Sequence, residues 1–254
     1  MRDALNWSSD SNFTIGGVSF ISTVNPAIYH TLKSSEDNFL LIKSREMIET
    51  ELKRYIDGVP VRNVVDIGIW QGGSVALLDL TLNPQRLLAI EYNPAPIPAL
   101  DTYVEKRHRN NISVHYGINQ GATDDVVKIL DETFGDDPID LVIDDASHQY
   151  IETKKSFEAI FPRMAPHSQF IIEDWQWSLS GNTWELDYFR DKPSLANLVV
   201  EIAAVVGSRR DLISEVTILP FCTIVKRGTA PYSKVPLKLD EIARSRGKSI
   251  EPVL

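Results

Sequence analysis

The feature that most constrains the fold of this chain is a regular alternation of short apolar runs and helix-patterned segments after residue 60. Apolar strands that are separated by helices indicate a parallel sheet covered by helices on both faces. The expected strands are Asn63–Ile67, Arg86–Glu91, Ile112–Tyr116, Ile139–Asp144 and Gln169–Glu173. The expected helices are Leu40–Tyr55, Ser74–Leu80, Pro98–Arg107, Asp124–Thr133, Ile151–Pro162 and Ser194–Val206. Two β-rich runs within residues 213–228, broken by Pro220, predict an antiparallel pair at one edge of the sheet.

The two ends of the chain differ from this pattern. Residues 1–38 are rich in Ser, Asn and Thr, which predicts an irregular arm or lid. Residues 229–254 form a basic tail, which we expect to be solvated and partly mobile.

Composition narrows the class of protein. The chain of 254 residues has a formal net charge of −9, which disfavours nucleic acid as the main partner. Its single cysteine, Cys222, excludes an internal disulfide and a cysteine-rich zinc site. No apolar run reaches membrane-spanning length, and the N-terminus lacks the apolar core of a signal peptide. We therefore expect a cytoplasmic protein with no membrane partner; we also expect it to form a homo-oligomer.

A glycine-rich turn follows the first expected strand, in the sequence DIGIWQGGS. Gly68, Gly72 and Gly73 let the backbone approach a ligand closely, and Ser74 can cap the following helix. The spacing differs from that of dinucleotide-binding loops, so a pyrophosphate ligand is disfavoured. Glu91 ends the next strand, where an acid can bind two ribose hydroxyls. These residues predict a nucleoside site; the alternative is a packing turn beside a surface glutamate.

Acidic residues gather at the ends of two apolar runs that we expect to be neighbouring strands. Asp144 and Asp145 end the first run, with His148 close behind, and Glu173 and Asp174 end the second. Buried acids are costly unless a cation or a reacting proton uses them. Since neighbouring strands lie about 4.8 Å apart, side chains just past their ends can converge on one ion. Carboxylate oxygens suit Mg²⁺ or another hard divalent cation.

His148 is the candidate base beside this metal site. An ordinary imidazole titrates near neutrality, and a cation lowers the pKa of an oxygen that it coordinates. Metal and base together could therefore activate a weakly acidic hydroxyl. The alternative is that Asp145 or Ser147 caps the next helix, with His148 at the surface and Glu173 and Asp174 in a solvated turn.

An aromatic-rich segment follows the second acidic cluster. Aromatic faces pack against sugar C–H surfaces or flat rings, so this segment is the candidate wall for an acceptor substrate. Core or oligomer contacts are the alternative role. The residues are Trp175, Trp177, Trp184 and Tyr188.

The order of elements, the D-x-G-x-x-x-G-G-S loop and Glu91 resemble class I S-adenosylmethionine-dependent methyltransferases. The sequence DDASH, followed by SFEAIFPRMAPHSQFIIEDW, is similar more narrowly to the metal-dependent sugar O-methyltransferases of macrolide biosynthesis and to the related cephalosporin-hydroxylase group. The resemblance covers roughly residues 40–228. It implies a Rossmann-like α/β domain over residues 39–228, with a mostly parallel seven-stranded sheet, helices on both faces and a C-terminal antiparallel hairpin.

The resemblance also implies roles for individual residues. S-Adenosylmethionine would contact Asp66, Gly68, Gly72, Ser74, Glu91, Gln120 and Asp144, with Gln120 near the adenine. Mg²⁺ would be bound by Asp145, Glu173 and Asp174. Asp145 and His148 would be catalytic.

The implied activity is transfer of a methyl group to a hydroxyl of a small molecule, in particular the sugar moiety of a glycosylated natural product such as an antibiotic. A catechol or phenol is an alternative acceptor. A different alternative is a cofactor-binding subunit that acts with a partner protein, as in the cephalosporin-hydroxylase group.

Overall fold

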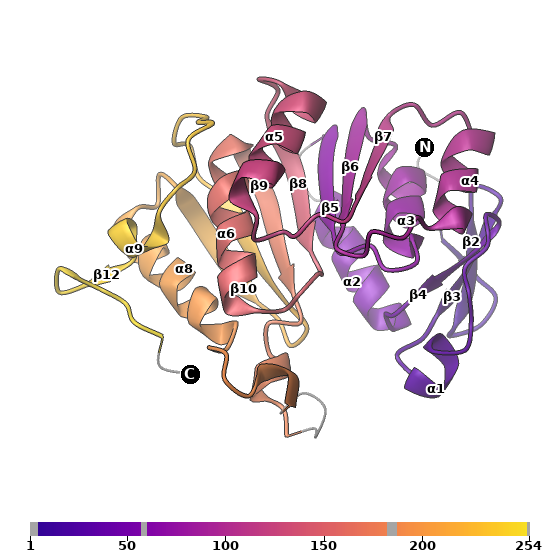
Figure 1. Ribbon diagram of the computed structural model, residues 1–254, viewed down its shortest axis with the longest axis horizontal. Coiled ribbons are helices and arrows are strands. Elements are labelled where there is room, and N and C mark those ends of the chain that lie inside the picture. Colours follow the sequence, from indigo (N-terminus) through magenta and orange to yellow (C-terminus); the bar gives the residue numbers. More distant parts are fainter. Residues whose placement is uncertain (1–4, 57–59, 182–186, 253–254) are drawn as a thin grey trace. The chain divides into compact units, whose positions relative to one another are not determined.

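The computed structural model describes residues 5–56, 60–181 and 187–252 (Figure 1). The chain divides into two compact units, Met1–Gly117 and Ile118–Leu254. Among the described residues, no helix has both the length and the apolar character needed to cross a lipid bilayer.

The first unit begins with a four-stranded sheet of order β1-β2-β3-β4. Its strands are β1 (Asn6–Trp7), β2 (Asn12–Ile15), β3 (Val18–Ser22) and β4 (Asn38–Leu41), and the short helix α1 (Pro26–Tyr29) lies between β3 and β4. The prediction of an irregular arm is therefore wrong. Phe13 and Phe20 are buried and stack with ring centroids 4.8 Å apart, whereas the alternate Thr14 and Ser19 are exposed. The polar residues are the outer face of a strand pattern with period two.

The predicted helix Leu40–Tyr55 is wrong at its start. Leu40 and Leu41 belong to β4, which pairs in parallel with β3, and helix α2 covers only Arg45–Ile56. Phe39, Leu40 and Leu41 are all buried. Such a continuous apolar run is compatible with a strand buried on both faces, which periodicity could not separate from the beginning of a helix.

The rest of the first unit follows the predicted alternation. The parallel strands are β5 (Asn63–Ile67), β6 (Arg86–Glu91) and β7 (Ile112–Tyr116), all with the predicted bounds. They alternate with α3 (Gly73–Leu82) and α4 (Pro98–Lys106). Helix α3 packs against β4, β6 and α4.

The second unit continues the alternation. Its elements are α5 (Thr123–Phe134), β8 (Ile139–Asp144), α6 (Tyr150–Ile160), β9 (Met164–Glu173), α8 (Ala196–Ser208), β10 (Ile213–Ile218) and β11 (Cys222–Arg227). Strands β8 and β9 are parallel, β11 is antiparallel to β9, and β10 is antiparallel to β11. Helix α8 packs on β10 and α6 (Figure 1). Strand β9 begins five residues before its predicted start at Gln169, because Met164 already pairs with Ile139 across an irregularity.

The strand order of the main sheet is β10-β11-β9-β8-β5-β6-β7. This order, with parallel pairs and a closing antiparallel hairpin, confirms the predicted fold class. In such sheets ligands bind beyond the carboxyl ends of the parallel strands, which is where β8 and β9 deliver their acidic residues.

The basic tail packs against α6, so the expectation of a solvated end is wrong for this stretch. The backbone N–H of Leu237 donates to the Glu158 carbonyl at 2.8 Å, and Leu239 is fully buried. Lys154 of α6 forms ion pairs with Asp240 of the tail and with Glu201 of α8. Helix α9 (Leu239–Ile242) and the small hairpin β12 (Arg244–Ser245) and β13 (Lys248–Ser249) complete the tail.

Two glycines test whether close packing fixes the start of α3. A Cβ at Gly73 would lie 2.3 Å from the Leu40 carbonyl oxygen, whereas a Cβ at Gly207 of α8 meets nothing within 4 Å. Gly73→Ala should lower the free energy of unfolding by about 2 kcal/mol because backbone must move. Gly207→Ala should raise it by roughly 0.5–1 kcal/mol because alanine stabilises helices. Urea unfolding curves of both variants measure the difference; equal shifts would contradict the packing argument.

Candidate active site

The glycine-rich turn joins β5 to α3 in a conformation that needs its glycines. Gly68 and Gly72 have φ values of +83° and +82°, in the left-handed region. The prediction that Ser74 caps α3 is wrong, because the helix begins at Gly73, and its cap residue, Gly72, has no side chain to accept a bond. Within the described chain, the buried Ser74 Oγ has no hydrogen-bond partner. This hydroxyl is therefore available to a ligand.

Glu91 anchors this turn from the end of β6. Its Oε2 accepts hydrogen bonds from the backbone N–H groups of Ile69 and Trp70, at 3.1 and 3.0 Å. Its Oε1 accepts the N–H of Asn93 at 2.8 Å. A carboxylate has about four acceptor sites, so capacity remains for a ligand hydroxyl. Glu91 thus holds the backbone of the turn, which is compatible both with a nucleoside site and with the alternative of a packing turn. Asp66, in β5, is fully buried.

Gln120 and Asp144 form a buried network in the second unit. The Gln120 amide nitrogen lies 3.1 Å from each carboxylate oxygen of Asp144, and Ser156 Oγ donates to Asp144 Oδ2 at 2.6 Å. Gln120 Oε1 accepts the N–H of Ser147 at 3.1 Å. Burial raises the pKa of Asp144 to about 6, with a smaller contribution from the negative charge of Glu173, while the hydrogen bonds oppose this rise. The amide of Gln120 is thus committed to the loop after β8.

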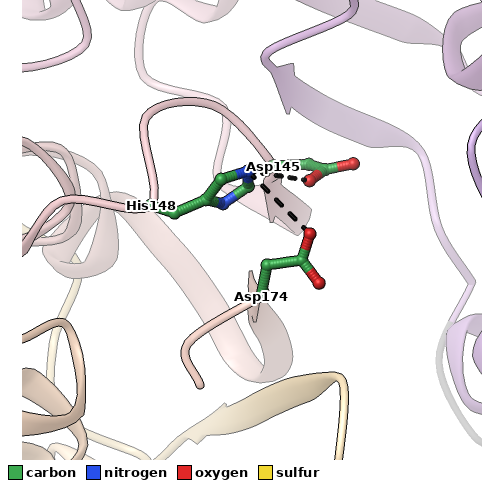
Figure 2. Close-up of side chains that lie close together, drawn as sticks. All are labelled: Asp145, His148 and Asp174. Atoms are coloured by element: carbon green, nitrogen blue, oxygen red, sulfur yellow. Dashed lines mark ion pairs between the residues drawn. The ribbon is translucent and has the colours of Figure 1, made fainter. Parts of the chain in front are cut away.

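Three of the predicted site residues come together just beyond the ends of β8 and β9. Figure 2 shows the carboxylates of Asp145 and Asp174 converging on the imidazole of His148. His148 Nε2 lies 3.8 Å from Asp145 Oδ1 and 3.9 Å from Asp174 Oδ2. One ligand atom from each residue lies within 4.8 Å of the others, as a shared metal ion requires. The His148 side chain is 11% exposed and that of Asp174 17%.

Two residues of this cluster have an unusual backbone. His148 has a φ of +53° and Asp174 a φ of +52°. Left-handed conformations are uncommon outside glycine and cluster at functional sites, because the surrounding structure must stabilise them. Hydrophobic patterning and residue type give no signal for these two turns.

Glu173, the remaining predicted metal ligand, is not in this cluster. It is buried at the end of β9, opposite Cys222 of β11 in the register, and its charge acts on Asp144. Glu173 is the last residue of β9, whereas Asp174 lies beyond the strand in its left-handed conformation.

The alternative reading of these acids as helix caps and solvated turn residues is wrong. The cap residue of α6 is Gln149, and no side chain makes a cap hydrogen bond there. Glu173 is 3% exposed. Buried or half-buried groups that converge at a strand end therefore need another explanation, such as a ligand.

The aromatic residues contact this cluster and its surroundings. The rings of Trp177 and His148 lie with centroids 4.4 Å apart. Trp175 Nε1 donates to the Leu219 carbonyl at 2.9 Å, and the Tyr188 hydroxyl donates to the Ser147 carbonyl at 3.0 Å. Trp184 lies outside the described residues.

Comparison with known proteins shows a similarity over part of the chain. Residues 65–175 match the family model of a methyltransferase domain. Solved structures with the same fold include the MycE methyltransferase from the mycinamycin biosynthetic pathway in complex with Mg and SAH, at 23% identity, a TM-score of 0.51 and coverage of 72% of this chain and 49% of that chain. A second MycE crystal form has 17% identity, a TM-score of 0.54 and coverage of 76% and 50%.

A further MycE structure, in complex with Mg, SAH and Mycinamycin VI, has 21% identity, a TM-score of 0.52 and coverage of 72% and 49%. This chain therefore spans about half the length of these proteins. The search of curated proteins gives no match. The family model thus matches the part of the chain from β5 to the end of β9, and these solved structures share its fold.

Proposed function

We propose that this chain is an S-adenosylmethionine- and Mg²⁺-dependent O-methyltransferase that acts on a hydroxyl of a small molecule. The acceptor we propose is a sugar moiety of a glycosylated natural product. The observation that carries this proposal is the convergence of Asp145, His148 and Asp174 in a chain with a methyltransferase domain.

The first unit offers groups that fit the cofactor. Ser74 Oγ is a buried hydroxyl without a hydrogen-bond partner in the described chain, and Glu91 retains acceptor capacity for ribose hydroxyls. Left-handed glycines in the turn allow a ligand to approach the backbone. S-Adenosylmethionine supplies an electrophilic methyl group on a sulfonium.

The second unit offers groups that fit a hard divalent cation. Asp145 and Asp174 provide oxygen ligands from two different strand ends. Glu173 lies outside this cluster, so Asp145 and Asp174 are the carboxylate ligands that we propose. A bound cation would lower the pKa of a hydroxyl that it coordinates.

His148 is the proposed general base. Its Nε2 lies 3.8 Å from the carboxylate of Asp145 and 3.9 Å from that of Asp174, so it is close to the groups that would hold the cation. S-Adenosylmethionine would supply the methyl group, and Nε2 would accept the proton that the acceptor hydroxyl loses. Packing against Trp177 orients the imidazole.

The acceptor class rests on the aromatic residues and on one comparison. Trp177 and Tyr188 lie beside the cluster, and aromatic faces suit sugar C–H surfaces. A MycE structure contains Mycinamycin VI together with Mg and SAH. Parallel assays with glycosylated macrolides, other glycosides and catechols compare the acceptors; exclusive turnover of catechols would refute the sugar assignment.

Removal of the metal tests the proposal directly. With a chelator present, formation of S-adenosylhomocysteine should fall by about 10²-fold or more, since metal activation contributes several kcal/mol. Added Mg²⁺ in excess over the chelator should restore the rate. Calorimetric titration with S-adenosylhomocysteine in both conditions shows whether the cofactor still binds. An undiminished rate in chelator would refute the metal requirement.

A further inference from the structure

The strained turn at His148 needs a structural cause. A left-handed φ of +53° at a histidine persists only where neighbouring groups hold it. The residue before it, Ser147, is held on both of its backbone polar groups. Both contacts come from side chains distant in the sequence.

Gln120 holds the first of these groups. Its Oε1 accepts the Ser147 N–H at 3.1 Å, while its Nε2 is 3.1 Å from both Asp144 oxygens and 3.3 Å from Thr153 Oγ1. Gln120 is 4% exposed, so water does not compete strongly for these bonds. Its amide therefore ties the end of β8 to the turn that follows it.

Tyr188 holds the second group. Its hydroxyl donates to the Ser147 carbonyl at 3.0 Å, and this carbonyl belongs to the peptide bond that leads into His148. The hydroxyl also lies 2.7 Å from the Gln149 side-chain amide. Tyr188 is 41% exposed, so removing its hydroxyl leaves no buried cavity.

We propose that Gln120 and Tyr188 are positioning residues. Together they bind the backbone of Ser147, and we call this pair the Ser147 clamp. The clamp holds His148 Nε2 between Asp145 and Asp174. Gln120 fixes the peptide before Ser147, and Tyr188 fixes the peptide after it. Gln120 thus acts on the loop that carries Asp145 and His148. Tyr188 acts through the backbone in addition to any contact with acceptor. The catalytic part of this inference rests on the proposed function.

Tyr188→Phe and Gln120→Met test the clamp. In each variant kcat for methyl transfer should fall about tenfold or more, because misplacing a catalytic group by about 1 Å can cost 10²-fold. KM for S-adenosylmethionine should stay within twofold. Tyr232→Phe is the matched control, since its hydroxyl lies 3.4 Å from the Gly135 carbonyl, away from the clamp, and kcat should be unchanged.

Ser156→Ala separates the clamp from simple loss of stability. It removes a hydrogen bond to the same Asp144 carboxylate but leaves the Ser147 N–H bond in place. Equal losses of kcat in Ser156→Ala and Gln120→Met would overturn the role of Gln120. A wild-type kcat in Tyr188→Phe would overturn the role of Tyr188.

Amide hydrogen exchange of the metal-free protein gives a readout that does not depend on the reaction. Loss of the clamp should make local opening of this loop more frequent. Exchange at residues 145–149 should therefore become at least about tenfold faster in Gln120→Met and Tyr188→Phe, but not in Tyr232→Phe. The two proposals can fail separately. If the wild-type protein neither transfers methyl groups nor binds Mg²⁺, the proposed function fails; faster exchange in the two variants would still support the clamp. Unchanged exchange in both variants would overturn the clamp.

Discussion

Replacing Asp174 by asparagine is expected to reduce Mg²⁺-dependent methyl transfer by about 10³-fold, because metal activation of the acceptor contributes several kcal/mol. Asparagine is the right replacement. Asp174 has a φ of +52°, a conformation that asparagine tolerates well and alanine does not. The variant therefore removes the charge and keeps the backbone. Initial rates across a range of Mg²⁺ concentrations, with calorimetric Mg²⁺ titrations, measure the effect.

Asp211→Asn is the matched control for Asp174→Asn. Asp211 is half exposed and pairs with Arg209 at 2.7 Å, and such surface pairs contribute little. Its rate and Mg²⁺ affinity should remain those of the wild-type protein. If Asp174→Asn also retained both, the cluster would not be a metal site.

Replacing His148 by asparagine is the second substitution with a large expected effect. General base catalysis contributes typically about 10²–10⁴-fold, so kcat should fall by about this factor. The φ of +53° at His148 again favours asparagine over alanine as the replacement. The ring contact with Trp177 is lost as well, and the intrinsic fluorescence of the variant reports that change. Steady-state kinetics with saturating S-adenosylmethionine measure kcat.

His167→Asn provides a control with the same side chain and backbone conformation. His167 is exposed and has a φ of +68°. The His167→Asn variant should keep the wild-type kcat.

Mg²⁺ titration of His148→Asn distinguishes two roles of His148. A Mg²⁺ affinity near that of the wild-type protein indicates a base. A loss of Mg²⁺ affinity as large as in Asp174→Asn would make His148 a metal ligand and refute the base assignment.

The central strands were predictable because burial on both faces leaves a direct trace in the sequence. Strands β5 and β8 are buried at every position, and their runs of apolar residues end where the sheet ends. The N-terminal sheet was not predictable in the same way. Its outer face is made of serine, threonine and asparagine, so overall composition concealed the alternation of Phe13 and Ile15 with polar neighbours.

The sequence predicted which residues gather at the candidate site, but it did not predict which of them contact one another. Asp145, His148 and Asp174 were placed together because each follows a strand end of a parallel sheet. Gln120 was expected at the adenine, yet it binds Asp144 and the Ser147 backbone. That assignment depends on which way an amide points after β7, which periodicity does not encode.

The sequence by itself determined the alternating architecture and the chemistry at its strand ends, because hydrophobic patterning and residue type are local properties. Only the tertiary structure decided which carboxylates meet: the left-handed turns at His148 and Asp174 join their side chains with Asp145, while Glu173 remains within its strand. Such turns are stabilised by contacts between residues far apart in the chain, as the bonds from Gln120 and Tyr188 to Ser147 illustrate.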